Sequence, residues 1–324
     1  MDSAEIERAA RLLAAGDLVA FATETVYGLG ADATNPEALA KIFAAKGRPA
    51  DHPLIVHIAD ASDMSRYARE LPEAARKLAQ AFWPGPLTMI VKRSDAMPPE
   101  ATGGQDSVGL RCPSHPLAQS LLRAFAKVGS GAIAAPSANK FGHVSPTTAQ
   151  HVRDEFGPGL LILDGGACDV GLESTIVDLS RGSPVLLRPG AIGRDDIARV
   201  LGAAPAERDA QAPRASGTLA SHYAPHTPLV LMDARRFADE LRVGDAVLAF
   251  RAPPAHRAAS AWIEAPLDPA RYGHDLYRNL RDLDRHRATR ILVEAPPRDA
   301  AWEAVNDRLG RAAAADDDDT PWRR

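Results

Sequence analysis

Residues 46–59 read KGRPADHPLIVHIA, and the order of residue types in this stretch decides how the surrounding chain folds. Its second half, PLIVHIA, is apolar except for His57 and is typical of a buried strand. Gly47 is suited to the C-terminal cap of a helix, and it directly follows residues 35–46, which carry a helical pattern. A helix, a turn and a buried strand in this order predict an α/β domain.

The first 200 residues alternate apolar runs of strand length with stretches of helical periodicity. More strands than helices, in irregular order, favour a mixed α/β sheet over a regular Rossmann repeat. Residues 23–33, TETVYGLGADA, are predicted to be a tight connection between a strand and a helix. The predicted strands are 18–22, 53–59, 87–93, 107–111, 132–136, 160–164, 174–179 and 184–190, and the predicted helices after the N-terminal one are 35–46, 70–83, 115–129 and 145–157.

The remainder of the chain changes character twice. Residues 201–226 are rich in Ala, Pro, Gly and Ser, which from composition alone indicates a solvated linker. Residues 227–314 alternate strands and helices regularly, which predicts a smaller Rossmann-like α/β domain, although no GxGxxG follows its first strand. The predicted organisation is a first domain over 1–200, this linker, the smaller domain, and a disordered acidic tail over 315–324.

Composition excludes several classes of protein. The chain has 324 residues, of which 45% are hydrophobic and 25% charged, as in an ordinary soluble globular protein. Its net charge of −4 lacks the basic excess of a protein that grips nucleic acid through phosphates. No apolar run is long enough for a membrane helix, and the acidic, amphipathic N-terminus does not have the features of a signal peptide, so we expect a cytoplasmic protein. With only Cys112 and Cys168, we expect neither a structural zinc site nor a disulfide framework.

Two cations, Lys46 and Arg48, lie in a turn at the end of a predicted helix. Cations at this place stabilise the helix C-terminus. A planar Arg fork beside a compact Lys charge can equally bind phosphate or carboxylate. The residues alone leave both interpretations open.

Other polar residues fall in turns or at strand ends. Residues 135–147, APSANKFGHVSPT, predict a turn and then a helix capped by Ser145, and a helix N-terminus is also a natural phosphate site. A lone His in an apolar strand, such as His57, is more often structural than catalytic. Arg111 ends a predicted strand, at an edge where ligands often bind.

The chain contains, in order, TETVYGLGADA, KGRPADHPLIVHI, WPGPLT, SVGLRCP, APSAN, SPT, ESTIVD and LRPG. Taken together, these motifs resemble the YrdC-like domain. The later HYAPHTP and the small α/β unit after it resemble the two-domain threonylcarbamoyl-adenylate synthases, so that the resemblance covers residues 5–312. It implies a YrdC-like fold, an open twisted mixed α/β sheet around a cationic cavity, joined to the smaller Rossmann-like domain.

The resemblance implies a nucleotidyltransferase. Members of the family make threonylcarbamoyl-adenylate and pyrophosphate from L-threonine, bicarbonate or CO2, and ATP. Other proteins transfer the threonylcarbamoyl group to tRNA, and these downstream transfer proteins are the expected partners. We expect Mg2+ to accompany ATP without a dedicated metal site in the protein, and we expect neither membrane association nor strong nucleic-acid binding.

The resemblance also implies roles for individual residues. Lys46 and Arg48 are the expected catalytic pair. His52 stands where Asn is expected, and Tyr223 resembles a residue that closes over the nucleotide, which would make the linker a lid. The expected ATP contacts are Lys46, Arg48, His52, Ser107, Ser137, Asn139, Ser145, Arg188 and Tyr223. The expected L-threonine contacts are Thr25, His57, Arg111, Ala135 (through its backbone) and Ser174.

Two other functions compete with this one. A concave cationic surface could hold RNA, but a net charge of −4 and 5% aromatic residues argue against it. The second competing function is a different carbamoyl transfer, as in hydrogenase-maturation proteins that contain a YrdC-like domain. Those proteins carry acylphosphatase and zinc-finger modules that have no counterpart in this sequence.

Overall fold

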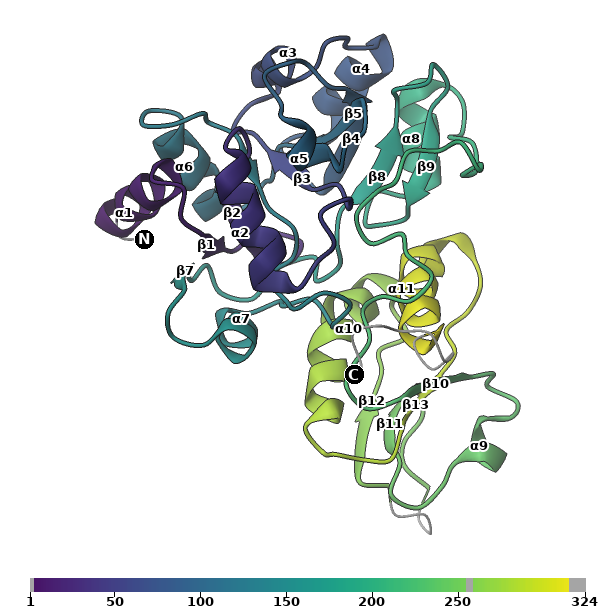
Figure 1. Cartoon of the computed structure of the whole chain (residues 1–324). Coiled ribbons are helices and arrows are strands. Elements are labelled where there is room, and N and C mark those ends of the chain that lie inside the picture. The colour runs from purple at the N-terminus through teal and green to yellow at the C-terminus, as the bar shows by residue number, and fades with distance from the viewer. Residues whose placement is uncertain (1–2, 255–258, 315–324) are drawn as a thin grey trace. The chain divides into compact units, whose positions relative to one another are not determined.

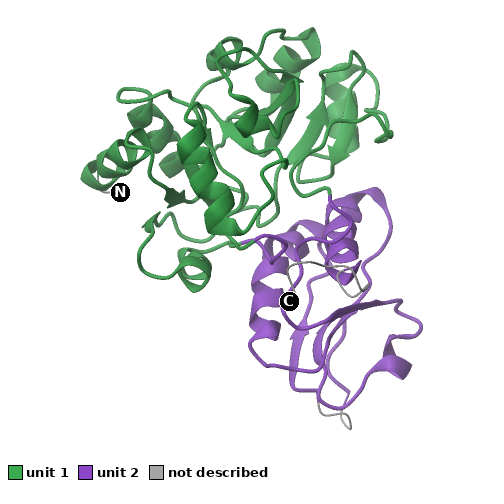
Figure 2. Ribbon diagram, viewed as in Figure 1, with its two compact units in different colours: residues 1–140, 146–218 green, residues 141–145, 219–324 purple. Residues whose placement is uncertain are grey.

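The computed structural model describes residues 3–254 and 259–314, and the chain divides into two compact units (Figure 2). Unit 1 comprises residues 1–140 and 146–218, and unit 2 comprises residues 141–145 and 219–324. The limits inferred from sequence, with a linker over 201–226, stay predictions, and the predicted tail over 315–324 lies outside the described residues.

Unit 1 is built on a nine-stranded sheet with the strand order β7-β1-β2-β6-β3-β5-β4-β8-β9 (Figure 1). The pairs β1/β7, β3/β5 and β4/β8 are parallel, and the other neighbours are antiparallel. The predicted mixed sheet is therefore confirmed. Its strands are β1 Val19–Phe21, β2 Gly28–Asp32, β3 Ile55–His57, β4 Leu87–Lys92, β5 Ser107–Arg111, β6 Ile133–Ala134, β7 Leu161–Leu163, β8 Thr175–Asp178 and β9 Val185–Arg188.

Capping residues close in sequence set the ends of helix α2 in unit 1. In α2, the side chain of Asn35 accepts hydrogen bonds from the first turn, and Gly47 adopts a left-handed conformation with φ of 65° at the other end, as the sequence predicts. The α-helices are α1 Ser3–Ala14, α2 Pro36–Lys46, α3 Met64–Tyr67, α4 Glu73–Phe82, α5 Pro99–Thr102, α6 Pro116–Phe125, α7 Ala149–Phe156 and α8 Arg194–Leu201, with a 3-10 turn at Ala61–Asp63.

Alternation along the central strands separates the two faces of this sheet. One face belongs to the main core of the unit, to which β3 gives Val56, β5 gives Leu110 and β4 gives Met89. The opposite face carries a smaller apolar cluster that is covered by Ala212 and Ala215. The residues of that cluster are Ile55, Ile90, Ile176, Val185 and Leu187. Several of the polar residues considered below, among them Thr88 and Ser107, lie on the strands of this second face.

Two sequence-based predictions in unit 1 are wrong. Residues 28–32 form strand β2 instead of a connection to a helix, because a tight turn lets them pair antiparallel with β1. The helix predicted from 145 begins only at Ala149, with Thr148 as its cap. The carbonyls of Pro146 and Thr147 accept hydrogen bonds from distant backbone N–H groups, so these residues are not available to a first helical turn.

Unit 2 has a four-stranded parallel sheet in the order β10-β13-β11-β12, which confirms the predicted smaller α/β domain. Asp268 caps its longest helix through Arg271 N. The strands are β10 Leu229–Met232, β11 Ala246–Ala249, β12 Ala261–Glu264 and β13 Ile291–Glu294, and the helices are α9 Phe237–Glu240, α10 Pro269–Asp284 and α11 Glu303–Ala313, with a 3-10 turn at Ala300–Trp302. Across the described parts of both units, no helix has the length and apolar character needed to cross a membrane.

Candidate active site

The second face of the unit 1 sheet is covered by residues 209–218, here called the strap. Its Ala212 and Ala215 pack on the apolar cluster of that face. Arg214 N donates to Oε1 of Gln105 at 2.7 Å, and Nε2 of Gln105 donates back to Arg214 O at 3.1 Å. The hydroxyl of Ser216 donates to Pro53 O at 2.8 Å. Reciprocal hydrogen bonds and apolar contacts therefore hold the strap on the sheet.

A narrow cavity of about 10 Å³ remains beneath the strap. Thr88, Ser107 and Gly109 line it from the sheet, and Ser216 lines it from the strap. A Cβ atom on Gly109 would approach Cγ2 of Thr88 to 3.3 Å, so the missing side chain keeps this part of the face open. Ser107, one of the expected ATP contacts, thus lies on the covered face.

Lys46 is turned inward from the end of α2. It is 3% exposed, and its Nζ donates to Ser137 O at 2.6 Å and to Asn139 O. Burial lowers its pKa well below the ordinary value, and the charge of Arg48 lowers it further. Favourable charge at a helix end does not require such burial, so this placement favours a role in the site. Lys46, Ser137 and Asn139 are brought together as a group.

Arg48 continues the same turn and reaches the strap. Its Nη2 donates to Pro53 O at 2.9 Å and lies 3.4 Å from the hydroxyl of Ser216. His52 is half-buried nearby, and burial together with the charge of Arg48 lowers its pKa. The turn after α2 thus directs a buried guanidinium toward the covered face.

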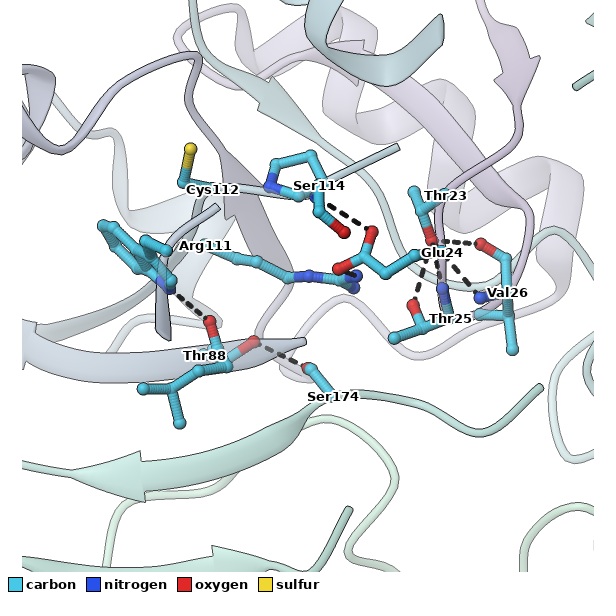
Figure 3. Close-up of polar contacts among 12 residues, drawn as sticks. Thr23, Glu24, Thr25, Val26, Thr88, Arg111, Cys112, Ser114 and Ser174 are labelled. Atoms are coloured by element: carbon cyan, nitrogen blue, oxygen red, sulfur yellow. Dashed lines mark hydrogen bonds and ion pairs between the residues drawn. The ribbon is translucent and has the colours of Figure 1, made fainter. Parts of the chain in front are cut away.

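Arg188, at the end of β9, joins the strap to the neighbouring strand. Its Nη1 donates to Ser216 O at 2.8 Å, while Nε and Nη2 donate to the carbonyl and hydroxyl of Ser174 at 3.0 and 3.1 Å. The hydroxyls of Ser174 and Thr88 lie 2.7 Å apart (Figure 3). The guanidinium of Arg188 therefore holds both Ser174, an expected threonine contact, and Ser216 of the strap.

His57 and Arg111 are register partners at the ends of the parallel strands β3 and β5, and Thr88 pairs with Arg111 from β4. Nη2 of Arg111 donates to Oε1 of Glu24 at 2.7 Å, and the two side chains point toward each other in Figure 3. Burial lowers the pKa of His57 to about 3, with a smaller contribution from the charge of Arg111, so the imidazole is neutral at neutral pH.

Three further expected residues are also buried. Thr25 is buried, and its hydroxyl lies 2.9 Å from that of Thr23 in the turn before β2. Ala135 donates its N–H to Ile55 O at 2.9 Å, so that its amide is used within the sheet. Ser145 is buried and belongs to residues 141–145, which are part of unit 2.

Tyr223 also belongs to unit 2, where it is buried. Its backbone has φ of 63°, which is strained for a residue other than Gly. The ring stacks on Tyr277 with centroids 5.8 Å apart, and the guanidinium of Arg308 lies 5.2 Å from its centroid. Its expected contact with ATP stays a prediction.

Four residues of this arrangement are not among those predicted from sequence: Glu24, Thr88, Gly109 and Ser216. The sequence did offer an indication for Glu24, because an acidic residue between two Thr in a turn can pair with a cation. The other three could be found only from strand register and from the path of the strap. Cys112 and Cys168 are buried free thiols. Within the described residues, no cluster of three or more His, Cys, Asp or Glu could hold a metal ion.

Comparison with known proteins identifies the family. The family model Sua5_yciO_yrdC, described as "Telomere recombination", matches residues 11–190, and the model described as "Threonylcarbamoyl-AMP synthase, C-terminal domain" matches residues 192–314. The threonylcarbamoyl-AMP synthase of Pyrococcus abyssi is 37% identical, with 95% of this chain and 94% of that protein covered. The synthase of Bacillus subtilis is 39% identical, with 95% and 93% covered.

A solved structure agrees with these matches. The crystal structure of P. abyssi Sua5 complexed with L-threonine superposes with a TM-score of 0.87 at 36% identity, covering 97% of this chain and 95% of that one. The fold and the resemblance inferred from sequence are thereby confirmed, and the chain belongs to the threonylcarbamoyl-AMP synthase family.

Proposed function

We propose that the protein makes threonylcarbamoyl-AMP and pyrophosphate from L-threonine, bicarbonate or CO2, and ATP, as a nucleotidyltransferase. The observation that carries the proposal is the meeting of Arg48 and Arg188 at Ser216. These two guanidinium groups come from elements about 140 residues apart in the chain, yet both reach one residue over the covered face. Planar guanidinium groups are well suited to bind phosphate oxygens.

The proposed chemistry needs positive charge more than it needs a nucleophilic side chain. The amine of threonine adds to CO2, loses a proton and becomes a carbamate. A carbamate oxygen then attacks the α-phosphorus of ATP, the bond to the β-phosphate oxygen breaks, and pyrophosphate leaves. Every group that approaches or departs is anionic, so positioning and charge neutralisation by Lys46, Arg48 and Arg188 would supply the catalysis.

The two substrates would occupy different ends of the covered face. The cations at the α2 turn and at the end of β9 suit the triphosphate. Arg111 suits the carboxylate of threonine, with Ser174 and the neutral imidazole of His57 close by in the sheet. Mg2+ would enter as MgATP, and the site fits this because its side chains are cations and hydroxyls, while a metal held mainly by substrate oxygens needs no protein cage.

The strap would act as a lid. A nucleotide needs a site of about 300–1,000 Å³, whereas the cavity under the strap is about 10 Å³. The strap would have to move to admit ATP, and its return would shelter a reactive adenylate from water. The product would pass to tRNA threonylcarbamoyl-transfer proteins in the cytoplasm.

Pyrophosphate release tests this proposal directly. The protein would be incubated with MgATP and bicarbonate, with and without L-threonine. Release should depend on threonine and should vanish in Lys46→Ala and Arg48→Ala, whereas Lys77→Ala, which changes an exposed lysine of α4, should leave it intact. ATP binding without release would contradict the proposal and indicate a YrdC-like fold with another acceptor. Salt-sensitive RNA binding without release would favour the RNA-binding function instead.

A further inference from the structure

Glu24 is held in place from three sides. Its Oε1 accepts from Nη2 of Arg111 at 2.7 Å, and its Oε2 accepts from Ser114 N at 3.1 Å (Figure 3). Its main-chain carbonyl accepts from Val170 N at 2.7 Å. Both side chains of the Arg111–Glu24 pair are only 5% exposed. The carboxylate is therefore a fixed part of the surroundings of Arg111.

The pair is incomplete as a purely structural ion pair. Nε of Arg111 is buried and has no hydrogen-bond partner among the described residues. A buried donor without an acceptor destabilises a fold, so native proteins rarely keep one without a reason. Arg111 thus has one N–H committed to Glu24 and another that a ligand oxygen could satisfy.

Glu24 also sets the charge that a ligand would meet. Arg111 and Glu24 together are neutral, and the imidazole of His57 stays neutral beside them. A zwitterionic amino acid would add no net charge to this buried group. Compared with a zwitterion, a plain carboxylate would bring one more net negative charge close to the Glu24 carboxylate, which is costly away from water.

We propose that Glu24 is a specificity-determining residue that makes the Arg111 site select zwitterionic amino acids over plain carboxylates. The proposal rests on the proposed function, because it takes Arg111 to bind the carboxylate of L-threonine. Without the charge of Glu24, Arg111 would be a general carboxylate site. With the charge of Glu24 present, the site also recognises the positive charge of the threonine amine, although the reaction later consumes that amine.

The test compares two ligands that differ in the amine. L-threonine and 3-hydroxybutyrate, which is threonine with hydrogen in place of the amine, would be titrated calorimetrically into the full chain and into Glu24→Gln. Gln keeps the size of the side chain, and its single amide oxygen can accept from Ser114 N or from Nη2 of Arg111, but not from both. The preference for threonine should fall by about tenfold or more in Glu24→Gln, partly because 3-hydroxybutyrate binds more tightly.

Asp178→Asn is the matched control, since it removes the charge of another buried carboxylate paired with an arginine in unit 1. Its ligand preference should equal that of the unchanged protein. Glu24→Asp, which keeps the charge, should retain most of the preference and serves if Glu24→Gln does not fold. An unchanged preference in a folded Glu24→Gln, or its loss in a folded Glu24→Asp, would overturn the proposal. Failure of the proposed function would appear separately, as no threonine-dependent pyrophosphate release from the unchanged protein.

Discussion

Arg188 donates through Nη1 to the main-chain carbonyl of Ser216 at 2.8 Å, which ties the end of β9 to the strap. Nη2 of Arg48 lies 3.4 Å from the hydroxyl of the same residue. The N–H groups that would turn toward phosphate oxygens are thus groups that contact the strap. Phosphate and strap would compete for the same donors, which would couple entry of the nucleotide to release of the strap.

Replacing Ser216 by Ala should loosen the strap. The hydroxyl donates to Pro53 O at 2.8 Å, and a lost hydrogen bond of this kind is worth about 1 kcal/mol. Trypsin cleavage after Arg208 and Arg214 should therefore become about fivefold faster, because cleavage follows local opening. Thr218→Ala removes a hydroxyl that donates to Ala215 O, within the strap, and should leave the rate unchanged. Equal cleavage rates in all three proteins would show that Ser216 does not hold the strap.

Gly109→Ala should impair substrate binding more than stability. The added methyl would lie 3.9 Å from Ile55 and Ile90 and 3.3 Å from Cγ2 of Thr88, a close contact that a shift of a few tenths of an ångström would relieve. The same methyl projects into the space that substrates would use, where overpacking costs about 1–3 kcal/mol. The KM for ATP or L-threonine should rise about tenfold or more, with Tm nearly unchanged. Gly159→Ala adds a methyl with nothing within 4 Å and should alter neither quantity.

Arg188→Lys should reduce activity although it keeps the charge. The guanidinium contacts the carbonyl and hydroxyl of Ser174 and the carbonyl of Ser216 at once, and an ammonium cannot reproduce this fork. Loss of one or two charge-assisted hydrogen bonds should lower kcat/KM by about 10–100-fold. Steady-state pyrophosphate release measures kcat/KM. Arg199→Lys, on the exposed surface of α8, is the control and should leave kcat/KM unchanged. Full activity in Arg188→Lys would mean that charge alone suffices at this position.

The sequence predicts those parts of unit 1 that depend on interactions between residues close to one another in the chain. The ends of α2 follow from Asn35 and Gly47, which act through their own neighbours. Strand β2 was missed because residues 28–32 have no strong strand pattern and are strands only through pairing with β1 and β6. The late start of α7 has the same origin, since distant N–H groups take the carbonyls of Pro146 and Thr147.

The candidate site shows the same division between local and long-range determinants. Cations and hydroxyls at strand ends could be nominated from their motifs. Glu24 could not be paired with Arg111 because the two lie 87 residues apart in sequence. The strap was visible only as a segment of small residues, and its contacts with Gln105 and Pro53 depend on the path of the chain over the sheet.

His57 should make the protein less stable in acid. Its pKa is about 3 in the folded chain, because burial and the charge of Arg111 disfavour the imidazolium, against about 6.5 when unfolded. Between these values the unfolded chain binds a proton that the folded chain does not, so stability falls as pH decreases from 6.5 toward 3. The loss approaches about 1.4 kcal/mol per pH unit, or about 2 kcal/mol at pH 5.

His57→Gln removes this titration and should flatten the acid side of the stability curve. Chemical denaturation at pH 7 and pH 5 would give the free energy of unfolding of both proteins. The unchanged protein should lose about 2 kcal/mol more than His57→Gln over this interval. His286→Gln, at an exposed position, should behave as the unchanged protein does. An equal loss in His57→Gln would show that the imidazole becomes protonated inside the fold, and the neutral His57 assumed beside Arg111 and Glu24 would have to be given up.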